Sequence, residues 1–189
     1  MESALIVSCT NKDTVFFTEM LKAASIHSIT ALQSCGETRR YLLERDFDLV
    51  IVNAPLRDET GESLARQIVS KGTSQVILVV ESEHLDAIAA VCETDGVLTL
   101  PKPVDRNLFW LTLALAKSAH NRIKKVQAEN ERLKLRIEDI RIVDQAKWKL
   151  VSHLKMSEQD AHRFIEKQAM DRRSSKREIA EAILKTYGN

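Results

Sequence analysis

Short, continuous apolar runs alternate with helix-patterned segments over the first 117 residues. Five runs are strand-like, the second of them weakly: 4–7, 28–32, 49–52, 76–80 and 97–100. Helical periodicity marks the segments between them: 15–24, 38–43, 64–69 and 85–91. Continuous runs rich in β-branched residues are typical of strands covered on both faces. The alternation predicts an α/β fold with a five-stranded parallel sheet, a flavodoxin-like arrangement in which functional groups gather at the carboxyl ends of the strands.

Beyond Asp105 the helical pattern continues without a break. No proline occurs from there to the end of the chain, and no glycine occurs before Gly188. A helix that begins near Asp105 can therefore run into the last third of the chain. We expect its first part to pack on the sheet through Leu108, Leu111 and Leu115.

The middle of this predicted helix carries a heptad pattern. Its six seam residues are spaced by three and four: Ile123, Val126, Asn130, Leu133, Ile137 and Ile140. Asn130 falls at an a position, where a single asparagine fixes the register of parallel two-stranded coiled coils. The pattern predicts a dimerising coiled coil over residues 118–142. A long amphipathic helix that packs on its own chain is the alternative.

Helix-start signals divide the C-terminal segment. Ser157 with Asp160 resembles a capping box, and Ser175 with Glu178 is a full one. They predict a long helix that ends near Leu154, followed by helices over 158–172 and 176–187. Nine apolar residues are predicted to form a small core: Leu150, Leu154, Ala161, Phe164, Ile165, Ala169, Ile179, Ile183 and Leu184.

Composition limits the class of protein to which the chain can belong. Apolar residues make up 44% of the 189 residues, enough for a globular core, and no apolar run approaches a membrane span. The three cysteines are scattered and lack metal-site spacing, so we expect a reduced cytosolic protein without contact to a membrane. His153 and His162 have no cysteine partners. No cofactor, metal site or enzymatic activity is expected, because no nucleophile–base pair or phosphate-binding glycine loop occurs.

The near-zero net charge conceals an asymmetry. Residues 1–117 hold 11 Lys and Arg against 16 Asp and Glu, whereas residues 118–189 hold 17 against 11. Seven cations are crowded near the C-terminus: Lys147, Arg163, Lys167, Arg172, Arg173, Lys176 and Arg177. Nucleic-acid contacts require cations for phosphates and planar groups for exposed bases. A solvated helix face is the alternative for each cation. Trp148 is expected to be a partly buried anchor, with stacking on a base as the alternative.

The order and spacing of the first 117 residues resemble the receiver domain of two-component response regulators. In that family acidic residues after the first strand bind Mg²⁺, and an aspartate that ends the third strand accepts phosphate. A Ser or Thr follows the fourth strand, and Lys-Pro follows the fifth. The matching positions here are Ser8, Cys9, Asn53, Val80 and Lys102, followed by Pro103.

Only the lysine–proline pair keeps the chemistry of the receiver family. An amide is not a carboxylate nucleophile, so Asn53 is not expected to form an acyl phosphate. Ser8 and Cys9 supply no charge for Mg²⁺. We therefore predict a pseudo-receiver that works without phosphorylation. Asp58 and Glu59 are the nearest alternative acids, and a solvated turn before a helix near Gly61 is the preferred interpretation of them.

The C-terminal segment resembles the ANTAR domain, the three-helix RNA-binding module of transcription antiterminators of the amidase-operon and nitrate-operon type. The likeness rests on these residues: Ala146-Lys147, Ser157-Glu158, Ala161, Ala169-Met170, Arg172-Arg173 and Glu178-Ile179-Ala180. It departs at Trp148, Lys149 and Lys155, where the family usually has glycine, an aliphatic residue and glycine. The resemblance implies binding of paired RNA hairpins with six-nucleotide loops in mRNA leaders. It also implies a regulatory protein partner at the receiver-like domain.

These expectations combine into three segments: a pseudo-receiver over 1–117, a coiled coil over 118–142 and an ANTAR domain over 143–189. The function they predict is a dimeric, RNA-binding transcription antiterminator. Two other classes stay open. One is a DNA-binding response regulator with a helix-turn-helix tail, which the lack of glycine before Gly188 in the tail disfavours. The other is a protein-interaction scaffold whose basic tail binds an acidic partner.

Overall fold

The computed structural model describes residues 1–72 and 74–187 and contains two compact units. The first unit is Met1–Lys124, and the second begins at Lys125. Helix α5 (Arg106–Leu154) contributes residues to both units. Asp105 caps its start, because the Leu108 N–H donates to the Asp105 carboxylate at 2.9 Å. None of the helices within the described residues is both long and apolar enough to cross a membrane.

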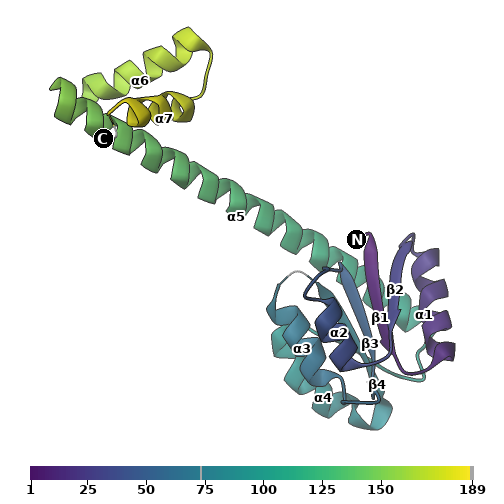
Figure 1. Cartoon of the computed structure of the whole chain (residues 1–189). Coiled ribbons are helices and arrows are strands. Elements are labelled where there is room, and N and C mark those ends of the chain that lie inside the picture. The colour runs from purple at the N-terminus through teal and green to yellow at the C-terminus, as the bar shows by residue number, and fades with distance from the viewer. Residues whose placement is uncertain (73, 188–189) are drawn as a thin grey trace. The chain divides into compact units, whose positions relative to one another are not determined.

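The first unit is an α/β domain, as predicted (Figure 1). Its strands are β1 (Ser3–Ser8), β2 (Ser28–Leu32), β3 (Leu49–Asn53), β4 (Gln75–Glu81) and β5 (Leu98–Lys102). Its other helices are α1 (Asn11–Ala23), α2 (Cys35–Tyr41), α3 (Glu62–Ser70) and α4 (Leu85–Cys92), with short 3₁₀ turns η1 (Ser82–His84) and η2 (Glu93–Asp95). The strand order is β2-β1-β3-β4-β5, and every pair is parallel.

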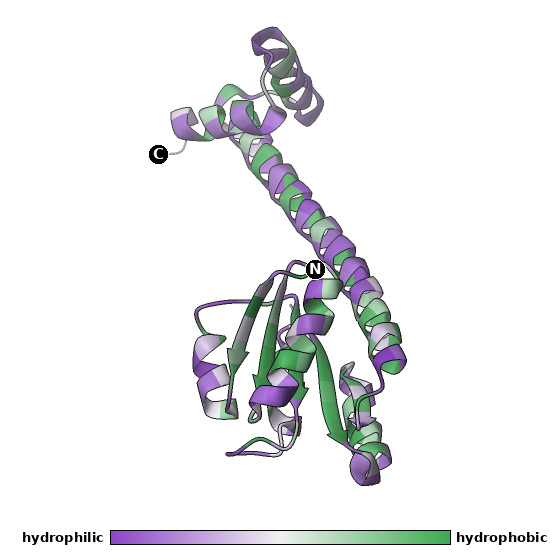
Figure 2. Cartoon of the chain, turned by 90° about the vertical axis from the view of Figure 1, so that its right-hand side faces the viewer, coloured by the Kyte–Doolittle hydropathy of each residue, from purple (hydrophilic) through white to green (hydrophobic). Residues whose placement is uncertain are grey.

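The sheet is buried on both faces, which explains the continuous apolar runs. Side chains alternate along β1, so that Leu5 and Val7 join one core cluster while Ala4 and Ile6 join the other. The strands are correspondingly hydrophobic along most of their length in Figure 2. The register pairs Ser8 with Asn53 and Glu81 with Lys102, so the last residues of these strands meet at one edge of the sheet.

The face of α5 that covers the sheet differs from our prediction. Phe109, Leu113 and Ala116 are buried in the core, whereas Leu111 is 60% exposed and Leu108 and Leu115 are also exposed. Both sets of residues recur at helical spacing, so periodicity does not distinguish them. Ring contacts decide the packing face, because Phe109 lies 5.7 Å from Phe17 and 6.4 Å from Phe16 between ring centroids.

The second unit contains the three predicted helices: the end of α5, then α6 (Glu158–Arg172) and α7 (Lys176–Tyr187). Ser157 Oγ accepts the Asp160 N–H at 3.1 Å and caps α6. At α7 the capping box is reciprocal: the Glu178 N–H donates to Ser175 Oγ, and the Ser175 N–H donates to the Glu178 carboxylate at 2.8 Å. The predicted helix starts are confirmed.

The small core of the second unit partly corrects the prediction. Six predicted members are buried, and Leu184 packs against them. Leu154 and Phe164 are instead 44% and 36% exposed, while Ala146 and Ala180 are buried. Buried alanines allow helices to approach closely, so the larger side chains are left at the edges of the bundle.

Candidate nucleic-acid interface and receiver-fold pocket

Asn53 ends β3 and occupies the position of the missing phosphoacceptor. Its side chain is buried, and its Nδ2 donates to Ser8 Oγ at 3.1 Å and to Asp13 Oδ2 at 2.9 Å. Asp13 also accepts a hydrogen bond from the Thr10 hydroxyl. The amide is therefore held by two partners in a polar network, and the carboxylate of Asp13 is already engaged.

Lys102 ends β5 and is engaged in the same pocket. Its ammonium group donates to the Ala54 carbonyl and lies 3.2 Å from Glu81 Oε1. The following Lys102–Pro103 peptide is cis. A cavity of about 470 Å³ opens beside these groups and is lined by Asp13, Asn53, Glu81 and Lys102 together with Phe16 and Phe17.

The remaining predicted pocket residues lie around this cavity without lining it. Ser8 is buried beneath Asn53, and the Cys9 thiol donates to the Pro55 carbonyl at 3.6 Å. Val80 is 2% exposed and packs in the core cluster on one face of the sheet. The structure thus brings Ser8, Asn53 and Lys102 to one strand edge and directs Val80 into the core.

Sequence reasoning missed two acids of this pocket, Asp13 and Glu81. Glu81 directly follows the apolar run of β4, so its place at a strand end was a usable signal. Asp13 lies in the first turn of α1, three residues after the N-cap residue Thr10, and no pattern in the sequence singles it out. Its proximity to Asn53 comes from the fold, because 40 residues separate the two in sequence.

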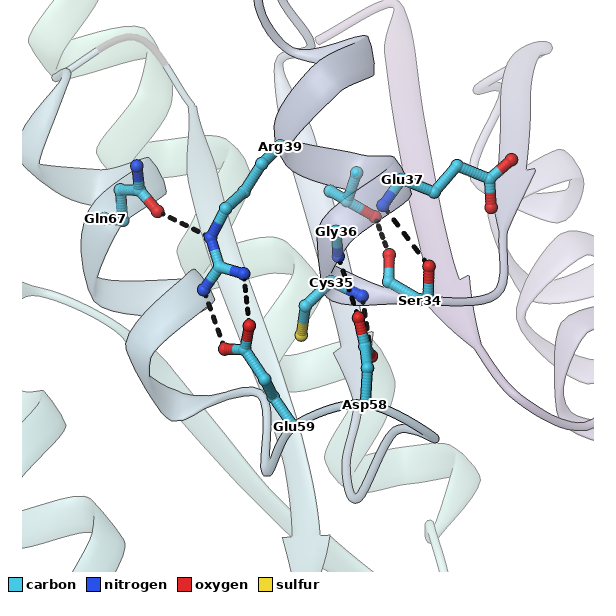
Figure 3. A network of polar contacts seen from close by, with 9 residues as sticks. Ser34, Cys35, Gly36, Glu37, Arg39, Asp58, Glu59 and Gln67 are labelled. Atoms are coloured by element: carbon cyan, nitrogen blue, oxygen red, sulfur yellow. Dashed lines mark hydrogen bonds and ion pairs between the residues drawn. The ribbon is translucent and has the colours of Figure 1, made fainter.

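Asp58 and Glu59 are structural in this fold (Figure 3). Asp58 accepts the backbone N–H groups of Cys35 and Gly36 at 3.0 and 2.9 Å, at the start of α2. These hydrogen bonds lower the pKa of the Asp58 carboxyl. Glu59 binds Arg39, whose hydrogen bonds lower the pKa of Glu59. Both carboxylates thus bind groups of α2 and connect that helix to the loop after β3.

Cys35, Asp58 and Glu59 are the one group of three potential metal-ligating side chains within the described residues. Burial, with the neighbouring negative charges of Asp58 and Glu59, raises the pKa of the Cys35 thiol to about 11. The thiol therefore stays protonated near neutral pH, and a protonated thiol is a poor metal ligand. The cluster fits a structural role in joining α2 to the β3–α3 loop.

The seven predicted RNA-binding cations divide into two groups in the structure. Lys147 lies 2.7 Å from Asp144 and 3.4 Å from Glu158, and these contacts raise its pKa. Lys176 binds Glu166, lowering the pKa of that carboxyl. Arg177 contacts Glu181 and Asp139, each at 2.8 Å. We call Lys147, Lys176 and Arg177 the paired cations.

The other four cations lie on α6 and its C-cap. Arg163, Lys167, Arg172 and Arg173 are exposed, and none of them has an ion pair or a side-chain hydrogen bond among the residues that the structure describes. We call them the free cations. Arg173 ends the helix in the left-handed conformation, with φ of 51°. Of the seven predicted cations, the four for which the structure describes no carboxylate partner therefore all lie on this helix and its C-cap.

Two departures from the ANTAR pattern acquire a structural meaning. Lys155 has a φ of 57°, a conformation that glycine adopts with less strain, in the turn between α5 and α6. Trp148 is 75% exposed, so the prediction of a partly buried anchor was wrong. Its indole lies on the side of α5 opposite the buried Ala146 and Leu150, because two residues along a helix correspond to about 200°.

The predicted coiled-coil seam is an exposed apolar stripe in the single chain. Val126 and Ile140 are each 60% exposed, and the other apolar seam residues are exposed to lesser degrees. Leu135 is equally exposed but lies off the heptad seam. The chain thus presents a row of large apolar side chains, which soluble monomers seldom leave in contact with water.

Fold and sites together define a class of protein. A parallel sheet of order β2-β1-β3-β4-β5 with a lysine–proline pair at the end of β5 is the receiver fold of response regulators. A helical unit that carries the free cations follows it.

Comparison with known proteins identifies this helical unit: residues 131–184 match the ANTAR domain. The chain is 28% identical over 141 residues to the transcriptional regulatory protein PdtaR of Mycobacterium tuberculosis, which covers 75% of this chain and 69% of PdtaR. The protein is a transcription antitermination regulator in which a receiver domain precedes an ANTAR domain.

Solved receiver domains support the fold of the first unit. The signal receiver domain of an HD domain-containing protein from Pseudomonas fluorescens superposes with a TM-score of 0.58 at 21% identity, covering 66% of this chain and 92% of that chain. A CheY-like receiver domain from Methylobacillus flagellatus gives 0.53 at 22% identity, with 61% and 98% covered.

Proposed function

We propose that this protein is a dimeric, RNA-binding antiterminator that binds paired hairpin loops in nascent mRNA leaders. The observation that carries the proposal is the ANTAR match over residues 131–184. The free cations of α6 support it, because phosphate contacts require positive charge that no neighbouring carboxylate already holds. The protein would act in the cytoplasm, where nascent mRNA is produced.

Dimerisation is the second part of the proposal. The exposed seam from Ile123 to Ile140 supports a parallel coiled coil, because a second copy would cover the same stripe with the same residues. Asn130, at an a position within that stripe, would fix the register. Two ANTAR domains held in one dimer would engage two hairpins with a higher effective affinity than either domain alone.

The third part concerns control of the protein. Asn53 has no carboxylate, and the two acids in its pocket are engaged with Asn53 and Lys102. We assign the receiver domain a phosphorylation-independent role in which a regulatory protein partner binds it. The segment bounds 1–117, 118–142 and 143–189 are part of the same proposal.

Exposure to a small-molecule phosphodonor should leave the native protein unlabelled. The reason is that Asn53 supplies no nucleophile and Lys102 is neutralised by Glu81. The measurement is radiolabelled acetyl phosphate with Mg²⁺, followed by intact-protein mass spectrometry. A phosphorylatable receiver domain treated in parallel shows that the donor is active. Label on any residue of the receiver domain would overturn this part of the proposal.

The RNA-binding function is tested with an RNA that carries two six-nucleotide-loop hairpins, titrated with protein across a salt series. We expect preference for this RNA over a single-hairpin RNA and a loop-scrambled RNA, with a salt slope of about −0.7 per phosphate contact. Duplex DNA completes the comparison. Preference for duplex DNA would favour a DNA-binding regulator, and equal weak binding to every probe would favour an interaction scaffold.

A further inference from the structure

The helices of the second unit leave a groove of about 250 Å³ between them. Six of the residues that line it matter here: Leu154, Phe164, Gln168, Arg172, Ile183 and Tyr187. We call it the α6–α7 groove. We propose that it receives one unpaired purine base of the RNA loop, which stacks on Phe164 and is recognised by Gln168 and Arg172. This inference rests on the proposed RNA-binding function.

The apolar wall of the groove comes from side chains that the core leaves out. Leu154 and Phe164 keep large exposed surfaces although their positions follow the helical core pattern. Tyr187 extends the wall and has its ring 5.6 Å from that of His153. A flat, largely apolar ligand would bury these surfaces, as aromatic side chains do with the splayed bases of RNA loops.

The size of the groove also fits a base. At about 30 Å³ of liquid volume per water molecule, 250 Å³ corresponds to roughly eight waters. That space is comparable to one planar heterocycle and small for a base pair. Single-stranded loops are the RNA elements that offer unstacked bases, so the groove matches a loop better than a stem.

The polar side of the groove can identify the base. Gln168 offers an amide with both donors and acceptors, and Arg172 offers a planar set of donors. Neither side chain has a hydrogen bond or ion pair within residues 1–72 and 74–187, in contrast to the paired cations on the same bundle. Glutamine pairs with the N6/N7 edge of adenine, and arginine pairs with the O6/N7 edge of guanine. Both pairings use the N7 edge of a purine, so the two side chains together favour a purine over a pyrimidine.

The surrounding charge suits the backbone that such a base would bring. Arg163 precedes Phe164 and Lys167 precedes Gln168, each about 100° away around α6. Arg173 follows Arg172 at the end of the same helix. A base in the groove would therefore leave its flanking phosphates beside free cations. The carboxylate of Glu166, on the same helix, is bound to Lys176.

The experiment compares Gln168→Ala with Gln159→Ala, a matched change at an exposed position on the opposite side of α6. The probe is the two-hairpin RNA, with each loop purine replaced in turn by a pyrimidine. We expect Gln168→Ala to weaken binding by about 5- to 150-fold, the range for one bidentate base contact, with an unchanged salt slope because the amide is uncharged. The native protein should prefer a purine over a pyrimidine at one loop position, and the Gln168→Ala variant should lose that preference. Gln159→Ala should bind as the native protein does.

A second readout follows stacking directly. 2-Aminopurine at the discriminating loop position should change its emission on binding, and Phe164→Leu should remove that change while keeping an apolar side chain. Thermal unfolding of each variant checks that the helices still fold. Equal affinity of the Gln168 and Gln159 variants for an RNA that the native protein binds would overturn the groove and leave the proposed function intact. Failure of the native protein to bind any hairpin RNA would overturn the proposed function itself.

Discussion

Leu133→Asp is expected to convert the dimer into a monomer and to weaken binding of the two-hairpin RNA by about 100-fold or more, the range in which linked sites exceed single ones. Leu133 lies at a d position of the seam, so the substitution would bury a carboxylate in each of two facing helices. An unpaired charge in an apolar interface costs several kcal/mol, more than one residue contributes through packing. Sedimentation velocity at micromolar concentration measures the first effect, and RNA titration the second.

The chain itself provides the matched control for this change. Leu135 is 62% exposed on the same helix but off the seam, so Leu135→Asp should leave the dimer unchanged. Both variants carry the same added charge and lose the same side chain. A native protein that sediments as a monomer, or a Leu133 variant that sediments like the Leu135 variant, would contradict the coiled-coil proposal.

The second large effect is expected at the free cations. Combined Arg163→Gln and Lys167→Gln substitutions should reduce the magnitude of the RNA-binding salt slope by about 1.4, which corresponds to two phosphate contacts. Binding at moderate salt should fall by one to two orders of magnitude, roughly as expected for two lost charge-assisted hydrogen bonds. The reason is that neither charge is compensated by a carboxylate within the described part of the chain.

The comparison pair for this prediction is Lys176→Gln with Arg177→Gln, which removes two paired cations. A phosphate would have to displace Glu166 from Lys176, and Asp139 or Glu181 from Arg177, before it gained the contact. We therefore expect a change in salt slope of less than half that of the free-cation variant. Equal losses in the two double variants would mean that ion pairing does not select the RNA-contacting surface. Circular dichroism at the assay temperature checks that both variants remain helical.

Much of the fold could be predicted from local pattern. β1, β3 and β4 are continuous apolar runs because both faces of the sheet are covered there, and the weaker β2 was predicted with the bounds it has. The starts of α6 and α7 follow from Ser157 and Ser175, whose side chains satisfy backbone N–H groups within three residues. Such signals are local, and a sequence carries them directly.

The receiver-fold pocket could be predicted only in part. Asn53 and Lys102 were found through the resemblance to receiver domains, whose functional residues stand at strand ends that share one edge of the sheet. Asp13 was missed because its contact with Asn53 depends on where α1 lies against that edge. Glu81 was missed although it directly follows the apolar run 76–80 and ends β4. Its pairing with Lys102 requires the register between β4 and β5, which no single segment contains.

By itself, the sequence determined the order of the helices and strands, the missing phosphoacceptor at Asn53 and the resemblance of the C-terminal helices to ANTAR domains. Only the tertiary structure decided which apolar stripe of α5 is buried, which cations are free and which side chains border the α6–α7 groove. Periodicity places residues on a face of a helix, but a long helix has several apolar faces. Packing between distant segments chooses among them, because close approach and ion pairing depend on three-dimensional neighbours.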